Sequence, residues 1–474
     1  MRTYPMIIGG ETIDTGKTFA VINPASGQAF ALAQEADVAQ VDAAVAAARH
    51  AFAAWSELPD TDRKRLLHRL GDLLELHTRE LMELVTLETG KPLHGLDGVG
   101  AGMELGGAIA WTRATADLDL EPVVIQDDHL ARVEVRHKPL GVVASITPWN
   151  WPLMIAIWHV IPALRAGNTV VLKPSEYTPL ATARLVELAN QILPAGVLNL
   201  VTGGGAVGAA LAGHAEVNKV VFTGSTRTGK RIMEMAATTL KRLTLELGGN
   251  DAGIVLPDAD IPKIAAQLFG AAFHNNGQTC ACLKRLYVHE RHYEELCAEL
   301  ARLAAEMKVG DGMDPATQLG PLQNQAQLDI VRTLSEEARA QGGTILAGGK
   351  AKPGPGYFFE PTIVAGLTNG TRLVDEEQFG PILPVIRYRD VEEAVRLAND
   401  NPNGLGGSVW SSDVSRAEEV ARRLQCGSVW INGHGAVQPD APFGGIKQSG
   451  IGVEFGRQGL LEFCSVQTLK ILKQ

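Results

Sequence analysis

The sequence has no run of basic residues and no long uninterrupted apolar segment. Its 43 lysines and arginines are outnumbered by 53 aspartates and glutamates, which gives a net charge of −10 at pH 7. This acidic balance argues against nucleic acid and anionic membrane surfaces as partners. The longest apolar stretch, roughly residues 140–164, is interrupted by prolines, an asparagine and a histidine. It is typical of a buried α/β core rather than of a membrane span.

Cysteine is scarce as well. The chain has five cysteines, and only Cys280 and Cys282 lie close together in the sequence. An odd and scattered set is no disulfide framework, so it favours a reducing, cytoplasmic setting. The cysteines and histidines offer no zinc-binding spacing, and we expect no metal site. No charged-then-apolar leader follows Met1, so we also expect no secretory signal.

The remaining composition is that of an ordinary globular protein. With 474 residues, 45% hydrophobic and 20% charged, the chain is long enough for two or three domains. From Gly141 onward, short apolar runs alternate with helical stretches; the runs are 142–146, 169–172, 197–201 and 219–222. A second alternating series follows Gly249 and continues to Trp430. Such alternation predicts βαβ units, and therefore an α/β fold with parallel sheets.

Two segments outside these series, residues 131–137 and 465–471, alternate apolar and polar residues. This pattern predicts half-exposed antiparallel strands. Such strands would leave unpaired edges on a monomer and could pair between subunits. A local β-arm on a monomer explains the same pattern.

One cysteine and one glutamate are the candidates for covalent chemistry. Residues 273–280 read Phe-His-Asn-Asn-Gly-Gln-Thr-Cys and present Cys280 after a Gly-Gln turn, while Glu246 lies in an upstream apolar segment. A thiol nucleophile and a base for a later step suit a two-stage covalent oxidation. The thiol needs a depressed pKa to attack as a thiolate, whereas apolar neighbours would raise the Glu246 pKa toward neutrality. Taken singly, an inert buried cysteine and a paired structural glutamate stay open.

A third candidate is Asn150. Residues 146–152 read Ile-Thr-Pro-Trp-Asn-Trp-Pro, just beyond a predicted strand. Pro148 and Pro152 restrict the backbone, which suits a rigidly positioned asparagine side chain. An amide held in this way can donate to a developing oxyanion. A buried asparagine that caps the next helix explains the segment equally well.

Two segments are candidates for a dinucleotide site. Residues 222–229 follow an apolar strand and open a helix, where a phosphate can meet the helix N-terminus. Thr226 stands where the G-x-G-x-x-G pattern has its middle glycine, so a dinucleotide would sit differently from the usual Rossmann pose. A plain tight turn is an equal alternative. Lys173 and Glu176 close another predicted strand and could reach ribose hydroxyls, although these residues alone favour a solvated charge pair.

In combination and in order, these motifs resemble those of the NAD(P)-dependent aldehyde dehydrogenase superfamily. Glu246 and Cys280 stand 34 residues apart, as in that family. The resemblance implies a Rossmann-like NAD(P)-binding domain over residues 1–119 and 140–247 and an α/β catalytic domain over 248–448. It also implies a small β oligomerisation arm with a C-terminal strand over 120–139 and 449–474, and hence a homo-oligomer, either a dimer or a tetramer.

The resemblance further implies a mechanism. Cys280 attacks the aldehyde carbon, the Asn150 amide and the Cys280 backbone N–H hold the thiohemiacetal oxygen, and hydride passes to the nicotinamide. Glu246 then activates the water that hydrolyses the thioester. The implied cofactor contacts are Ile146, Trp149, Lys173, Glu176, Gly224, Ser225, Glu377 and Phe379. The implied residues of the substrate tunnel are Trp151, Ile155, Trp158, Thr279 and Phe443.

Cofactor and substrate preferences follow from the same positions. Glu176 would accept from a ribose 2′-hydroxyl and repel a 2′-phosphate, so we expect NAD, with NADP possible because Lys173 is near. The tunnel positions are mostly apolar and the segment 433–437 is small, so we expect an apolar or aromatic aldehyde. His159 stands where many members have lysine, and we expect it to weaken any proton relay to Glu454 and Glu246.

Three other functions compete. A CoA-acylating dehydrogenase of the same fold needs no base for hydrolysis, so Glu246 argues against it. A non-catalytic binding protein leaves the combination of Cys280, Glu246 and Asn150 unexplained. A thiol hydrolase would need a His/Asn pair, which the sequence does not identify, and would leave the cofactor motifs without a purpose.

Overall fold

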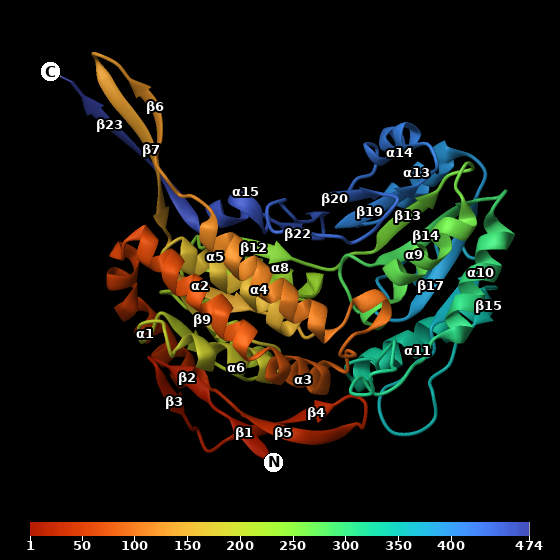
Figure 1. Cartoon of the computed structure of the whole chain (residues 1–474), viewed down its shortest axis with the longest axis horizontal. Coiled ribbons are helices and arrows are strands. Elements are labelled where there is room, and N and C mark those ends of the chain that lie inside the picture. The colour runs from red at the N-terminus through yellow and green to blue at the C-terminus, as the bar shows by residue number, and fades with distance from the viewer. Residues whose placement is uncertain (474) are drawn as a thin grey trace.

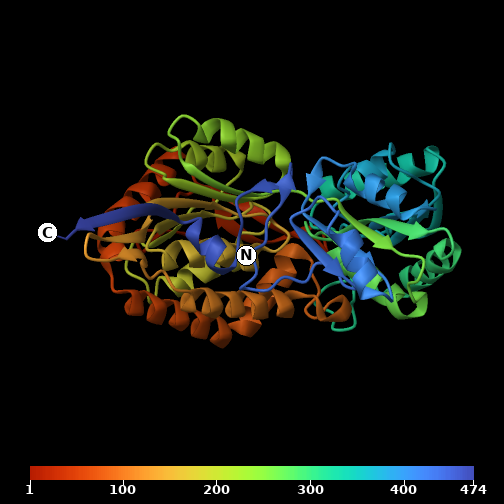
Figure 2. The ribbon, with the colours of Figure 1, turned by 90° about the horizontal axis from the view of Figure 1, so that it is seen from above.

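Two sheets, each covered by helices, form two lobes that lie side by side, and a narrow strand arm projects from the first lobe (Figures 1 and 2). The computed structural model describes residues 1–473; Gln474, the end of the predicted C-terminal segment, lies outside the described residues. Within residues 1–473 no helix is both long and apolar enough to cross a membrane.

The first sheet has eight strands in the order β22-β12-β11-β8-β9-β10-β2-β3. Its parallel centre consists of β8 (Val142–Ile146), β9 (Thr169–Lys173), β10 (Leu198–Leu200), β11 (Lys219–Thr223) and β12 (Arg242–Glu246). Antiparallel edges are added by β2 (Met6–Ile8), β3 (Glu11–Ile13) and β22 (Gly450–Ile451). The four strands predicted from the apolar runs are therefore confirmed.

Helices cover both faces of this sheet because successive side chains of its buried strands point to opposite faces. One face carries α1 (Val38–Glu57), α7 (Gly205–Gly213) and α8 (Thr226–Ala236). The other carries α2 (Asp60–Leu76), α3 (Thr78–Thr89), α4 (Ala101–Asp117), α5 (Pro152–Arg165) and α6 (Leu180–Ala189). Within β8, Val142 and Ala144 face the first group, and Val143 faces the second.

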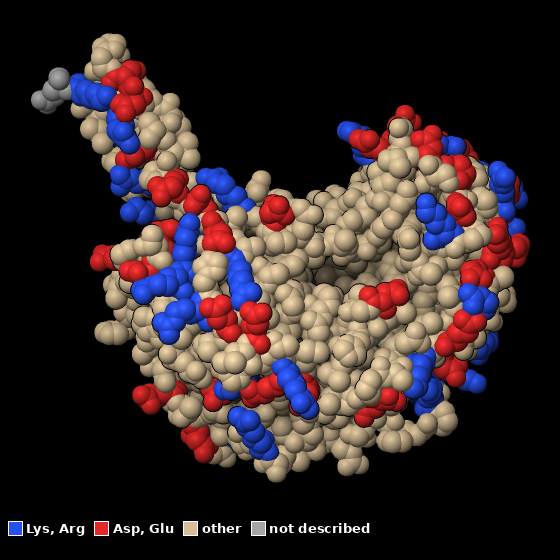
Figure 3. Space-filling view, viewed as in Figure 1, with Lys and Arg blue, Asp and Glu red and all other residues tan. Residues whose placement is uncertain are grey.

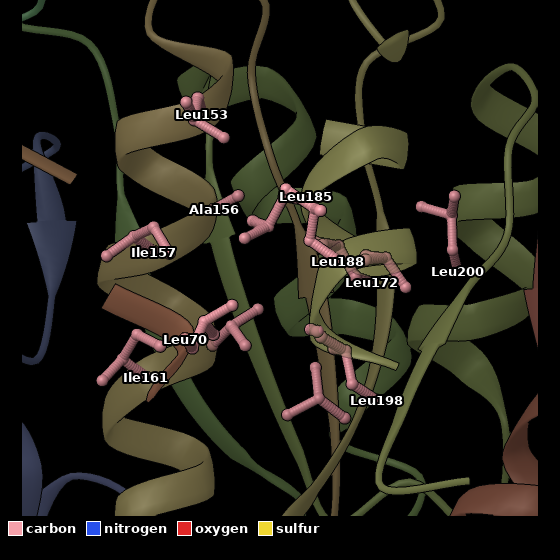
Figure 4. Packing of buried hydrophobic residues seen from close by; sticks show 14 of the residues in the cluster. Leu70, Leu153, Ala156, Ile157, Ile161, Leu172, Leu185, Leu188, Leu198 and Leu200 are labelled. Atoms are coloured by element: carbon pink, nitrogen blue, oxygen red, sulfur yellow. The ribbon is translucent and has the colours of Figure 1, made fainter. Parts of the chain in front are cut away.

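Helix α5 is apolar nearly all round and is correspondingly buried along its length. Figure 4 shows its side chains meeting those of α2, α6, β9 and β10; the labelled residues are Leu70, Leu153, Ala156, Ile157, Ile161, Leu172, Leu185, Leu188, Leu198 and Leu200. Each fully buried leucine or isoleucine stabilises the fold by about 1.5–3 kcal/mol. This packing fixes α5, and with it the residues just before its first turn.

The second sheet has seven strands in the order β15-β16-β17-β14-β13-β19-β20. They are β13 (Asp251–Val255), β14 (Leu283–His289), β15 (Thr344–Ala347), β16 (Thr362–Ala365), β17 (Ile382–Tyr388), β19 (Gly406–Trp410) and β20 (Ser428–Ile431), all parallel except β15. Its helices are α9 (Ile261–Phe273), α10 (Tyr293–Glu306), α11 (Gln325–Ala340), α12 (Arg372–Asp375), α13 (Val391–Asn399) and α14 (Val414–Ala421). The predicted second α/β series is confirmed.

The arm is a three-stranded antiparallel sheet of β6 (Val123–Asp127), β7 (Ala131–Pro139) and β23 (Cys464–Leu472). β23 pairs with β7 from Cys464 opposite Pro139 to Leu472 opposite Ala131. Both predicted strands are therefore confirmed, and they pair with each other within one chain. The arm stands away from the body in Figure 1.

Short elements complete the chain. β1 (Arg2–Tyr4), β4 (Thr18–Asn23) and β5 (Gln28–Gln34) form a small sheet, and β18 (Asn403–Gly404) pairs with β21 (Ile446–Lys447). Two short 3₁₀ turns are η1 (Leu96–Gly98) and η2 (His274–Gly277), and α15 (Gly456–Leu461) precedes β23. β22 comes from the predicted C-terminal segment yet joins the first sheet beside β12. The proposed domain boundaries stay predictions.

Candidate active site

The candidate catalytic residues come from three parts of the fold and meet between the lobes. Glu246 ends β12 in the first lobe, Asn150 lies between β8 and α5, and Cys280 follows α9 and η2 in the second lobe. Asn150 and Cys280 border one cavity of about 260 Å³. Figure 3 shows the molecule hollowed between the lobes, with few charged side chains around the hollow.

The turn before Cys280 explains the Gly-Gln motif. Asn275, Asn276 and Gly277 all have positive φ, at 50°, 56° and 72°. A Cβ at Gly277 would collide with the carbonyl oxygen of Gly380, so glycine is the residue that fits. Lys284 Nζ donates to that Gly380 oxygen at 3.2 Å and to Gly277 O at 2.5 Å. The cysteine therefore stands at the end of a tightly held loop.

The environment of the thiol differs from the expected one. Burial raises the pKa of Cys280, and the carboxylates of Glu246, Glu377 and Asp251 raise it further, against one hydrogen bond from the Ala281 N–H. The depressed pKa that sequence reasoning required is not found in this structure. Since burial is the main cause of this raised pKa, the thiol is protonated at neutral pH in the chain alone, and attack requires a proton acceptor.

Glu246 is the candidate for this proton acceptor. Its carboxyl is buried, and neither oxygen has a hydrogen-bond partner within residues 1–473. Burial, followed by the nearby charge of Glu454, raises the pKa of Glu246 well above its usual value. The predicted effect of its apolar setting is therefore confirmed, and the alternative of a paired structural glutamate is wrong for the described structure.

His159 lies next to this pair of carboxyls. Its Nε2 is 3.2 Å from Glu454 Oε1 and 2.9 Å from Thr223 Oγ1, and its Nδ1 is 3.0 Å from Ser145 Oγ. The imidazole therefore lies against Glu454, and the expected weakening of a proton relay to Glu454 and Glu246 stays a prediction. The hydroxyls of Ser145 in β8 and Thr223 at the end of β11 lie within hydrogen-bond distance of the two ring nitrogens. These contacts fix the orientation of the imidazole beside Glu454.

Asn150 is held by both its side chain and its backbone. Its Nδ2 donates to Gln278 O at 3.0 Å, and its carbonyl accepts from Lys91 Nζ at 2.9 Å and from Asn275 Nδ2 at 3.2 Å. An amide nitrogen carries two donors, so a second N–H is left for an oxyanion. The alternative role as a helix cap is wrong, since Glu104 accepts from the first amides of α5.

A larger cavity of about 530 Å³ opens on the other side of Cys280. All five predicted tunnel residues line it, and so does the small segment 433–437. Its lining is mainly apolar, and within residues 1–473 Asp97 is the only Asp, Glu, Lys or Arg that contributes to it. Sequence reasoning missed Trp111 of α4, whose ring centroid lies 5.8 Å from that of Trp158.

Five of the predicted cofactor residues line the smaller cavity: Trp149, Gly224, Ser225, Glu377 and Phe379. The other three lie apart from it. Ile146 and Lys173 pair across the ends of β8 and β9, and Glu176 borders a separate cavity of about 400 Å³. Lys173 Nζ lies 3.4 Å from Glu176 Oε2. Because the Lys173 side chain is buried, the alternative of a solvated charge pair is wrong for this lysine.

The donors and acceptors around the smaller cavity fit a dinucleotide. Ser225 caps the N-terminus of α8, where backbone N–H groups favour a phosphate. Thr226 bonds through its hydroxyl to Gln448 O at 3.3 Å, which accounts for a side chain at the middle-glycine position. Burial raises the pKa of Glu377 to about 8, and a Cβ at Gly248 would collide with its carboxylate. Glu377 Oε1 accepts from Gly249 N at 3.1 Å, which holds this side chain at the edge of the cavity.

Two buried charge pairs near the site carried no sequence signal. Lys91 pairs with Glu104 behind Asn150. His434 Nε2 lies 3.3 Å from Asp251 Oδ2 behind the cavity segment 433–437. The partners are 13 and 183 residues apart in the sequence, and no local pattern connects them.

Comparisons with known proteins agree with this geometry. The sequence matches the Aldehyde dehydrogenase family over residues 12–469. It is 40% identical over 487 residues to the phenylacetaldehyde dehydrogenase of Pseudomonas fluorescens, covering 99% of this chain and 96% of that protein. It is 39% identical over 467 residues to the retinaldehyde dehydrogenase 3 of Homo sapiens, covering 96% of this chain and 90% of that protein.

Solved structures match over the whole chain. The aldehyde dehydrogenase from Bacillus cereus in complex with NAD⁺ superposes with a TM-score of 0.97 at 37% identity, covering 100% of this chain and 97% of that one. The predicted fold class, α/β with a Rossmann-like lobe, a second α/β lobe and a β arm, is confirmed.

Proposed function

The chain belongs to the aldehyde dehydrogenase family and is an oxidoreductase, and we propose that it oxidises an apolar or aromatic aldehyde to the carboxylic acid with NAD⁺. One observation carries this proposal. The single thiol of Cys280 borders both the large apolar cavity and the smaller cavity that fits the dinucleotide. An aldehyde held in the first would present its carbonyl carbon at the boundary with the second.

The chain's own residues perform the bond-making steps of this proposal. Cys280 adds through sulfur to the aldehyde carbon, its proton passes to Glu246 and from there to solvent, which leaves Glu246 ionised again, and the Asn150 amide stabilises the oxyanion. NAD⁺, when bound, supplies the acceptor for the hydride that leaves this carbon. Glu246 then takes a proton from water, which attacks the thioester carbon and releases the acid and the Cys280 thiol.

The arrangement also bears on the alternative, acyl transfer to CoA. That reaction needs no base to activate water, whereas a buried Glu246 with unpartnered oxygens lies near the thiol. Hydrolysis of the thioester uses a base at this position, whereas acyl transfer to CoA does not. Reduction of NAD⁺ that requires added CoA and yields acyl-CoA would contradict the hydrolytic proposal.

Filling the large cavity tests the substrate class. Gly433 lines this cavity, and nothing lies within 4 Å of a Cβ built there. Gly433→Leu is expected to lower kcat/KM for an aromatic aldehyde by about 10- to 100-fold, because the added side chain competes for its space. Acetaldehyde should be little affected. The readout is the absorbance of reduced nicotinamide across an aldehyde series.

Gly106→Leu is the matched control, since it lies on the exposed face of α4 with equally open surroundings. An equal loss for large and small aldehydes in Gly433→Leu would contradict the assignment of this cavity to the substrate.

Glu176 is the expected determinant of NAD over NADP. Its carboxylate borders a cavity next to the end of β9, and a negative side chain there repels a 2′-phosphate. Glu176→Gln is expected to raise kcat/KM for NADP relative to NAD by at least about tenfold. Glu35→Gln, which borders the same cavity, is the control for a general change in potential. A wild-type preference for NADP would refute this role.

We propose that the protein is a homo-oligomer assembled through the arm. Large apolar side chains are exposed on β6, on β23 and in the β6–β7 turn: Val123, Val124, Ile125, Leu130, Val466, Ile471 and Leu472. Such a patch on a protruding sheet favours association. Deleting residues 465–474 should lower the molar mass in light scattering, as should Val466→Asp, which leaves β23 in place. A monomeric wild-type protein at micromolar concentration would overturn the proposal.

A reducing, cytoplasmic location is part of the same proposal. All five cysteines are free in the structure, and the proposed chemistry requires the Cys280 thiol to stay reduced. Cell fractionation that places the protein in an oxidising compartment would contradict it.

A further inference from the structure

A buried lysine lies directly behind the segment that carries Asn150 and Trp151. The side chain of Lys91, which follows the end of α3, is fully buried. Its ammonium pairs with the Glu104 carboxylate, donates to Asn150 O at 2.9 Å, and lies 3.2 Å from the centroid of the Trp151 ring. One ammonium group thus contacts α4 and two consecutive residues of the active-site segment.

Glu104 of α4 extends this contact to the start of α5. Its side chain is also fully buried, and its Oε1 accepts from Leu153 N at 3.0 Å and Met154 N at 3.2 Å. The N-cap residue of α5, Trp151, makes no side-chain capping bond of its own. Since the first amides of a helix lack partners within the helix, Glu104 caps α5 from a neighbouring helix.

The pair is poorly explained as a device for stability. Burial penalises charge so strongly that it lowers the pKa of Lys91 to about 8, even though Glu104 lies against it. Two apolar residues of similar volume often pack such a position equally well or better. What apolar residues could not do is bond to the Asn150 carbonyl and to the α5 amides. The polar pair is therefore best explained by the groups that it orients.

The oriented groups face the reacting atoms. The side-chain direction of Asn150 follows from its backbone, and Lys91 holds that backbone at the carbonyl. Trp151 Nε1 donates to Thr279 Oγ1 at 3.0 Å, next to Cys280. A misplacement of about 1 Å in such a constellation can cost about 10²-fold in rate.

We propose that Lys91 and Glu104 are positioning residues, which set the Asn150 amide against the oxyanion and the Trp151 ring against the aldehyde. This role rests on the proposed function, in which Asn150 is the oxyanion donor.

The test is a double-mutant cycle. Lys91→Met keeps the length of the side chain and removes its charge, and Glu104→Gln keeps one acceptor oxygen. In each, kcat and kcat/KM for an aldehyde are expected to fall together by about 10- to 100-fold, as for an interaction that matters in the transition state, with unchanged affinity for NAD. Adding Lys91→Met to Asn150→Ala should slow the enzyme by less than about twofold more.

Two further measurements separate positioning from a general loss of structure. Lys241→Met removes another buried ammonium, which bonds only to His214 O among the described residues, and should leave the kinetics unchanged. Hydrogen exchange followed by mass spectrometry should speed up over residues 150–154 in Lys91→Met and Glu104→Gln, and stay unchanged over β13 and β14.

The outcomes are distinct. Faster exchange over 150–154 together with the non-additive loss in rate supports the proposal. Faster exchange with a normal kcat overturns the positioning role. So does a double mutant whose rate loss is the product of the losses of Lys91→Met and Asn150→Ala. Both outcomes leave the proposed function intact. A wild-type protein that reduces no NAD with any aldehyde refutes the proposed function, and the positioning role with it.

Discussion

Cys280→Ser is expected to abolish aldehyde oxidation while leaving NAD binding measurable. A serine hydroxyl at this buried site is a much weaker nucleophile than a thiol, and the surrounding carboxylates disfavour its ionisation even more. Removing the nucleophile of a covalent mechanism lowers kcat by about 10³-fold or more. The measurements are the initial rate of nicotinamide reduction and the quenching of tryptophan fluorescence by NAD.

Cys282→Ser is the matched control for this variant. Cys282 stands two residues away and is fully buried, and its Sγ bonds to Ala271 O at 3.0 Å and Ala272 O at 3.2 Å. A hydroxyl can make the same bonds, so turnover should be close to that of the wild type. Near-normal turnover of Cys280→Ser would show that the wrong thiol was assigned.

Sequence reasoning reached the fold because the signal was periodic and local. The apolar runs of β8, β9 and β11 are buried on both faces, which gives each strand a continuous hydrophobic signature. The arm strands alternate apolar and polar residues, and this period of two predicted them as strands although β6 and β23 are largely exposed. What no local pattern could reveal was the pairing of β22 with β12.

The sequence predicted only those site residues that lie in short segments of distinctive composition. Cys280, Glu246 and Asn150 each follow an element that positions them, and their segments have distinctive neighbours. Lys91 and Trp111 carry no such mark, because tertiary packing alone brings α3 and α4 against the start of α5.

The electrostatic setting of the site could not be predicted from the sequence. Attack by Cys280 as a thiolate requires a lowered pKa, yet burial and three acidic side chains from distant segments raise the pKa of this thiol. The imidazole of His159 lies 3.2 Å from Glu454, a carboxyl far away in the sequence. Charge environments depend on side chains from several elements, so residue type alone does not determine them.

Glu246→Gln is expected to stop the reaction after the thioester has formed. A glutamine at this position cannot take a proton from water, and the loss of a general base costs about 10²–10⁴-fold in rate. The first turnover should still release reduced nicotinamide as a burst, and intact-mass spectrometry should find the acyl group on Cys280. An unchanged steady-state rate with no acyl-enzyme would make Glu246 a structural residue.

The pH dependence gives an independent test of the same role. Burial and the charge of Glu454 raise the pKa of Glu246, and only the ionised carboxylate can act as the base. The wild-type deacylation rate should therefore rise with pH through this raised pKa and level off above it, and Glu246→Gln should lose this rise. Glu88→Gln is the matched control, because Glu88 is also buried with a pKa of about 8 but caps α6 through Leu180 N and Ala181 N. A rise with pH that survives in Glu246→Gln would assign the base to another group.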